Sequence, residues 1–165
     1  MSMSNGIKKL QEEYKSIKKK GILAQIGGSA RPINKTNFLH WCACFIGPKD
    51  TPYEDGYYFL EMKFDKNYPN TGPEDVQMRT PIYHPNISNN KGHICVSYIN
   101  DWEPTNDVAG IVMAVFNLLS DPNPLDGYFN KIDLEKAKEI NIKFANADQK
   151  IDWTNSWNNG WSKIK

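Results

Sequence analysis

The sequence predicts a mixed α/β fold of the α+β kind, in which an antiparallel sheet lies between N-terminal and C-terminal helices. Three observations support this class. Apolar residues recur at helical spacing near the N-terminus, alternate at strand spacing through the middle, and return to helical spacing after residue 106. The 165 residues fit one domain over 1–165, with a core at about 5–145 and a Trp-rich C-terminal extension at 150–165.

The first predicted helix covers about residues 4–20. Its apolar residues at helical spacing are Ile7, Leu10, Tyr14 and Ile17. Ser4 is a suitable N-cap and Gly21 a suitable stop. Lysines crowd the same segment, beginning with Lys8 and Lys9. Such a run is either a solvated helix face or a docking surface for an acidic partner.

Three strands are predicted in the middle of the chain. "NFLHWCACFIG" at 37–47 is rich in aromatic and small apolar residues. "GYYFLEMKFD" at 56–65 alternates and predicts a half-buried strand. The Pro-, Asp- and Gly-rich segment between them predicts a turn, so the two strands form a hairpin. A weaker strand is predicted at about 74–79.

Helical spacing returns in "NDVAGIVMAVFNLLS" at 106–120, which is apolar almost all round and predicts a buried helix. Asn106 or Asp107 is its expected N-cap. Prolines 122 and 124 prevent it from continuing. The last helical pattern runs through Leu134, Ala137, Ile140, Phe144 and Ala147. Trp153, Trp157 and Trp161 follow at intervals of four, as a stripe that packs a terminal helix or as a partner-binding face.

Composition argues against several classes of protein. The net charge of +1 gives no strong field for nucleic acid or a membrane surface. Three cysteines do not suggest a disulfide framework, and the polar, Lys-rich N-terminus does not resemble a signal peptide. No apolar segment is long enough to span a bilayer. We therefore expect a soluble protein of a reducing compartment, cytoplasmic and/or nuclear.

The segment 80–105 is long and nearly free of regular pattern, which is typical of a functional loop. It contains "YHPNISNNKGHICVSYINDW", residues 83–102. Cys95 in this stretch is a small buried hydrophobe, a metal ligand or a nucleophile. Possible co-ligands are His84, His93, His40, Cys42 and Cys44. No CxxC or HxxxH spacing is present, so we expect no metal site.

Four motifs follow one another along the chain: "YHPN", "G-x-I-C", "W-x-P" and "LLSDPNP". They come after the segment "FLHWCACFIGPKDTPYEDGYYFLEMKFDKNYP". Together these segments resemble the ubiquitin-conjugating enzymes. The resemblance covers about residues 5–145. It implies the fold of that family: an N-terminal helix, a four-stranded antiparallel meander, an active-site segment and C-terminal helices. It also implies that Cys95 accepts ubiquitin from the activating enzyme as a thioester and passes it to a lysine or a ligase.

The resemblance assigns roles around Cys95. Asn86 matches the asparagine to which oxyanion stabilisation is attributed, or it only braces the active-site loop. His84 and Pro85 are architectural. Asp126 matches the family's acidic position, whereas Ser97 stands where many members carry Asp. Ser120 and Asn123 also belong to the rim of the site.

The resemblance also implies partners: ubiquitin, the activating enzyme, ubiquitin ligases and substrate proteins. Lys8 and Lys9 match the surface that docks the activating enzyme. Pro104 and Thr105 match one ligase-facing loop, while Asn70 replaces an aromatic residue in the other. No cofactor is expected, since ATP is used upstream by the activating enzyme. The alternatives are an enzyme for another ubiquitin-like modifier and a non-catalytic ubiquitin-binding scaffold, a class that lacks the cysteine.

Overall fold

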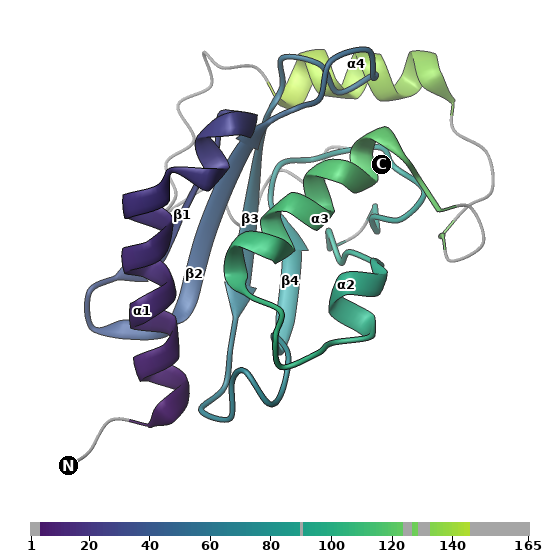
Figure 1. Ribbon diagram of the computed structural model, residues 1–165. Helices are drawn as coiled ribbons and strands as arrows, with labels where there is room; N and C mark the ends of the chain where they lie inside the picture. The colour runs from purple at the N-terminus through teal and green to yellow at the C-terminus, as the bar shows by residue number, and fades with distance from the viewer. Residues whose placement is uncertain (1–3, 90, 124–126, 129–132, 146–165) are drawn as a thin grey trace.

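The predicted α+β class is confirmed by the computed structural model, which describes residues 4–89, 91–123, 127–128 and 133–145 (Figure 1). The elements are α1 (Asn5–Lys20), η1 (Ile22–Ile26), β1 (Ser29–Asn34), β2 (Asn37–Ile46), β3 (Tyr57–Lys63), β4 (Asp75–Met78), α2 (Ser97–Asn100), α3 (Val108–Ser120) and α4 (Leu134–Phe144).

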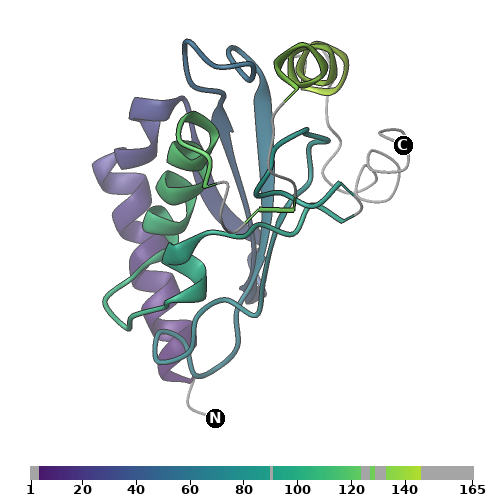
Figure 2. The ribbon, with the colours of Figure 1, turned by 90° about the vertical axis from the view of Figure 1, so that its right-hand side faces the viewer.

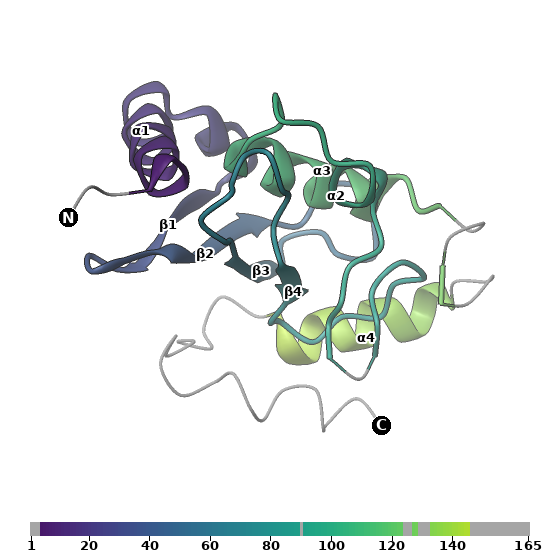
Figure 3. The ribbon, with the colours of Figure 1, turned by 90° about the horizontal axis from the view of Figure 1, so that it is seen from below.

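The four strands form one antiparallel meander in the order β1-β2-β3-β4. Helices α1 and α3 cover one face of this sheet, whereas α4 lies on the opposite side (Figures 2 and 3). Trp41 and Phe45 of β2 and Leu60 of β3 point into the layer beneath α1 and α3 and are completely buried. Such burial of apolar surface is the main stabilising contribution to the fold.

Helix α1 begins and ends where the sequence predicted. The Ser4 hydroxyl accepts a hydrogen bond from the Ile7 amide at 3.3 Å, and Gly21 ends the helix at φ 58°. Its buried face carries one charged residue, Glu13. The Glu13 carboxylate accepts hydrogen bonds from the Tyr68 hydroxyl and the Val108 amide, both at 2.8 Å. Burial raises the pKa of this carboxyl above its usual value.

Strand β1 is the strand of the sheet that the sequence patterns did not locate. Its sequence, SARPIN, contains a proline, which cannot donate a ladder hydrogen bond. Pro32 is tolerated because β1 is an edge strand, paired only with β2. The fourth strand of the meander was therefore implied by the family resemblance alone.

Helix α3 spans Val108–Ser120, and its N-cap is Asp107, whose carboxylate accepts from the Gly110 amide at 2.7 Å. The prediction that it is buried almost all round is only partly right. Asn117 and Ser120 are exposed, and Phe116 is half-buried against Phe45. The side of α3 that carries Asn117 and Ser120 is therefore exposed to solvent.

Helix α4 packs against the turn between β2 and β3. The Asn141 amide nitrogen donates to the Glu54 carbonyl at 3.1 Å, and the Ala145 carbonyl accepts from the Tyr57 amide at 2.8 Å. Ala137 and Ile140 of the predicted apolar pattern are buried, whereas Leu134 of the same pattern is 55% exposed. Ala147 and the three tryptophans at 153, 157 and 161 lie outside the described residues. Within the described ranges, no helix has the length and apolar character needed to cross a bilayer.

Candidate active site

The segment from Asn86 to Cys95 forms a short hairpin-like loop. The Cys95 amide donates to the Asn86 carbonyl at 2.8 Å, and the Ser88 amide donates to the His93 carbonyl at 2.9 Å. Ile87 and Ile94 are buried and anchor the two arms in the core. The loop turns through Gly92 at φ 73°, a left-handed conformation that favours glycine. This arrangement fixes the main chain of Cys95.

The Cys95 side chain is half-buried and opens onto a groove of about 280 Å³. Residues of two segments line the groove: Cys95, Val96, Ser97, Tyr98 and Asn100 from one, and Ala114, Asn117, Leu118, Asp121 and Asn123 from the other. Helix α2 lies beside α3 at this groove (Figure 1). The Asn100 amide nitrogen lies 3.6 Å from Cys95 Sγ. An attacking or leaving group therefore has access to the sulfur from the groove.

Asn86 is completely buried, and its side chain bonds the main chain of Asn123 twice. Its Nδ2 donates to the Asn123 carbonyl at 2.7 Å, and its Oδ1 accepts from the Asn123 amide at 2.9 Å. These two hydrogen bonds join the loop that carries Cys95 to the chain after α3 and hold the two segments together.

His84 occupies the centre of this buried region. Its Nε2 donates to the Leu118 carbonyl at 2.9 Å, and its Nδ1 accepts from the Asn86 amide at 3.0 Å. The ring is therefore neutral, with the proton on Nε2. Burial lowers its pKa from 6.5 to about 4. The neighbouring Pro85 carbonyl accepts from the Tyr128 amide at 2.6 Å.

The structure gathers some of the predicted rim residues and separates others. Ser97 and Asn123 line the groove, while Ser120 is exposed at the end of α3 and is not part of the lining. Asp126 lies outside the described residues. The sequence patterns did not indicate Asn100 or Asp121, both of which line the groove. The only available signal was their polar character close to Cys95 and to the end of a helix.

The surfaces predicted to bind partners are exposed to different degrees. Asn70, Pro104 and Thr105 are all exposed, and their loops meet where Trp102 Nε1 donates to the Pro69 carbonyl at 2.8 Å. Lys8 is exposed on α1, whereas Lys9 is only half-exposed.

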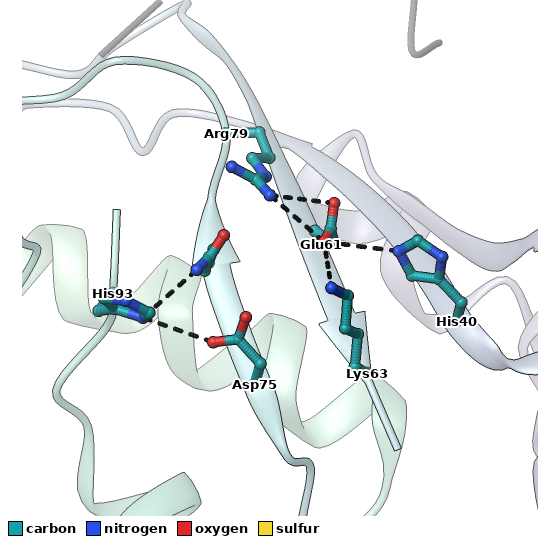
Figure 4. Close-up of polar contacts among 7 residues, drawn as sticks. His40, Glu61, Lys63, Asp75, Arg79 and His93 are labelled. Atoms are coloured by element: carbon teal, nitrogen blue, oxygen red, sulfur yellow. Dashed lines mark hydrogen bonds and ion pairs between the residues drawn. The ribbon is translucent and has the colours of Figure 1, made fainter. Parts of the chain in front are cut away.

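The histidines considered as metal ligands have other partners. His40 lies 3.5 Å from the buried carboxylate of Glu61, which Lys63 and Arg79 also approach, while His93 pairs with Asp75 at 3.4 Å (Figure 4). His84 is held by Leu118 and Asn86. In the described part of the chain, no group of three or more His, Cys, Asp or Glu is placed to hold a metal ion.

Known proteins match both the sequence and the fold. A family model described as "Ubiquitin-conjugating enzyme" matches residues 9–150. The chain is 42% identical to "Ubiquitin-conjugating enzyme E2 2" of Saccharomyces cerevisiae and to that of Eremothecium gossypii. Each match covers 118 residues, 71% of this chain and 65% and 66% of those proteins, so the aligned part spans just under two thirds of their length.

A solved structure shows the same fold. It belongs to a candidate ubiquitin conjugating enzyme from Plasmodium yoelii, aligned with a TM-score of 0.75 at 30% identity over 88% of this chain and 98% of that one. The structure is thus that of an α+β protein with a half-buried cysteine beside a polar groove. The matches in sequence and fold show that the chain belongs to the ubiquitin-conjugating enzyme family.

Proposed function

We propose that this chain accepts ubiquitin from the activating enzyme as a thioester on Cys95 and transfers it to a substrate lysine or to a ligase. The observation that carries the proposal is that Cys95 Sγ opens onto the groove while its main chain is fixed by Asn86. In the first step the Cys95 thiolate attacks the carbonyl carbon of the activating enzyme's thioester. A new C–S bond forms, the old one breaks, and the activating enzyme's cysteine leaves as a thiolate. ATP is consumed upstream, so this step needs no cofactor.

The other two cysteines are less suited to this exchange. Cys42 is buried in β2, and burial raises the pKa of its thiol, which disfavours the reactive thiolate. Cys44 is half-buried and its Sγ lies 3.4 Å from the Ser29 hydroxyl on the outer face of the sheet. Neither residue lines the groove, so both serve as internal controls for Cys95.

In the second step a lysine amine attacks the thioester carbonyl and an oxyanion develops on the carbonyl oxygen. We assign Asn86 the role of holding the Cys95 loop, because its amide is already bonded to Asn123. The second N–H of the Asn86 amide remains to donate, but Asn86 is completely buried, so direct donation to the oxyanion would require its side chain to move towards the groove. Asp126 is proposed, from the motif alone, as the carboxylate that attracts the amine. Asp121 adds a carboxylate to the groove.

The proposal includes two partner surfaces. Lys8 and Lys9 would dock the activating enzyme, and Asn70, Pro104 and Thr105 would face a ligase. Lys8→Glu should raise the concentration of this protein needed for half-maximal charging, and more so at low salt. Lys35→Glu, on the turn between β1 and β2, is the matched charge reversal and should leave charging unchanged. If both variants charge like the parent, Lys8 is not part of the docking surface.

The decisive experiment charges the protein with ubiquitin, activating enzyme and ATP and resolves the products on a non-reducing gel. We expect a ubiquitin adduct that is destroyed by a reducing thiol. Cys95→Ser should give only a slowly formed ester that resists the thiol, whereas Cys44→Ser should charge normally. A thiol-labile adduct on Cys95→Ser would refute the assignment of the nucleophile.

The second candidate function is conjugation of another ubiquitin-like modifier. It retains Cys95 as the nucleophile and differs only in the activating enzyme that docks. Parallel charging reactions with several modifiers, each with its own activating enzyme, distinguish the two. Charging by another modifier but not by ubiquitin would replace the first proposal.

A further inference from the structure

Asn100 is placed against the sulfur of Cys95 by the single turn of α2. The Asn100 main-chain amide donates to the Val96 carbonyl at 3.0 Å, and this bond closes the turn. The chain thereby returns to the cysteine, and the side-chain Nδ2 of Asn100 lies 3.6 Å from Cys95 Sγ. The Asn100 side chain is exposed and lines the groove. It therefore faces the space that a bound thioester and an incoming amine occupy.

Asn86 and Asn100 both contact Cys95, Asn86 through its main-chain carbonyl and Asn100 through its side chain, and their side-chain amides lie in opposite surroundings. Asn86 is completely buried and both ends of its amide are bonded to the Asn123 main chain. Asn100 is exposed, and its amide nitrogen contacts the reacting atom itself. Asn117 and Asn123 also line the groove, but the side-chain amide in hydrogen-bonding contact with Sγ is that of Asn100.

The transfer of ubiquitin to a lysine develops negative charge at two atoms near this amide. Attack of the amine nitrogen forms a C–N bond and moves the carbonyl electron pair onto oxygen, which lies two bonds from Sγ. When the tetrahedral intermediate collapses, the C–S bond breaks, its electron pair leaves on Sγ, and the amine proton passes to water. An N–H donor already in position stabilises such charge without the cost of reorienting solvent.

We propose that Asn100 is a further catalytic residue, whose amide donates to the oxyanion of the thioester and to the departing Cys95 thiolate. This inference rests on the proposed function of Cys95 as the thioester-bearing residue. It also divides two tasks between two asparagines: Asn86 holds the loop, and Asn100 stabilises charge in the groove.

The test is single-turnover discharge into free lysine of protein pre-charged with ubiquitin on Cys95. Asn100→Leu keeps the approximate size of the side chain and removes the donor. We expect it to charge to the same extent as the parent and to discharge about ten to a hundred times more slowly, since loss of one oxyanion donor in a well-studied hydrolase has an effect of that size or larger. Asn100→Asp should discharge at least as slowly, because a carboxylate in contact with Sγ itself repels the negative charge that leaves on that atom.

The matched control is Asp101→Ala, the next residue along and the C-cap of α2. Asp101 is exposed and is not part of the groove lining, so this variant should discharge at the parental rate. The melting temperature of each variant is measured together with its discharge rate. The inference is overturned if Asn100→Leu discharges at the parental rate. It is also overturned if the variant slows together with Asp101→Ala and melts several degrees lower, since Asn100 would then only maintain α2. Failure of the parent to charge on Cys95 would instead refute the proposed function.

Discussion

The two sides of Cys95 differ sharply in how their polar groups are satisfied. On the buried side, His84 and Asn86 have no exposed surface, and both ring nitrogens and both ends of the amide are hydrogen-bonded. On the groove side, Ser97 and Asn100 are exposed, and the Asn100 side chain donates to Cys95 Sγ at 3.6 Å. Cys95 thus lies between buried groups that hold the fold together and exposed groups that the proposed chemistry would use. Changes on the buried side should alter folding and rate together, whereas changes on the groove side should alter rate alone.

The largest expected effect comes from His84→Ala. This change leaves the Leu118 carbonyl and the Asn86 amide without their buried partner and opens a cavity between them. We expect the free energy of unfolding to fall by about 3–4 kcal/mol. Urea denaturation followed by tryptophan fluorescence measures this loss. His93→Ala removes a histidine that is 45% exposed and should change stability by less than about 0.5 kcal/mol. A cost below about 1 kcal/mol for His84→Ala would contradict the importance of the buried side.

Acid should weaken the same region in the parent protein. The unfolded chain protonates His84 below about pH 6.5, whereas the folded chain holds its pKa at about 4. The contribution of His84 to stability is therefore complete above pH 6.5 and is lost as the pH falls towards 4, by about 3 kcal/mol.

Glu13 acts in the opposite direction. Its raised pKa contributes stability below its unfolded value of 4.5, and that stability is lost as the pH rises through the folded value. Because Glu13 titrates in both proteins, comparing the parent with His84→Gln isolates the effect of His84. The difference between their free energies of unfolding is measured at steps from about pH 7 to about pH 4. This difference should shrink as the pH falls. A difference that stays constant would show that His84 does not titrate differently in the two states.

A smaller effect is expected for Asn86→Ala, which removes the two hydrogen bonds to the Asn123 main chain. We expect the free energy of unfolding to fall by about 2 kcal/mol and both charging and discharge to slow, because the Cys95 loop loses its brace. Asn123→Ala is the matched control, since it keeps the main-chain groups that bond Asn86. Unchanged stability with slowing confined to discharge would show instead that Asn86 donates directly to the oxyanion.

The smallest effect on stability is expected for Ser97→Asp on the groove side, within about 0.5 kcal/mol of the parent. Its discharge into lysine should be a few times faster, because a carboxylate there attracts an amine whose pKa in solution is about 10.4. Single-turnover discharge between about pH 6.5 and pH 9 measures this gain. Ser16→Asp on α1 makes the same change of charge far along the chain and should leave discharge unchanged. Equal rates for both variants would mean that no further carboxylate is needed in the groove.

Local patterns predicted much of the fold but little of the site's geometry. Capping residues and periodicity placed α1 and α3, because these signals depend on neighbours in the sequence. Strand β1 escaped detection since Pro32 is compatible with an edge position that only the assembled sheet defines.

The site depends on contacts between distant segments. His84 meets the Leu118 carbonyl 34 residues away, and Asn86 meets Asn123 37 residues away. No local period encodes either pair. Asn100 is close to Cys95 in sequence, but its contact depends on the single turn of α2, which is too short to leave a periodic signal.

The hydrogen bond from Val108 to Glu13 makes one amide a reporter of how α1 sits on the domain. The first N–H groups of a helix have no partner within the helix and ordinarily exchange their hydrogen with solvent readily. At Val108 that N–H instead donates to a carboxylate on α1. Deuterium uptake at this amide should therefore follow the undocking of α1 and not the fraying of α3. A partner that pulls α1 away from the sheet would be detected at Val108, at the opposite end of α3 from the groove.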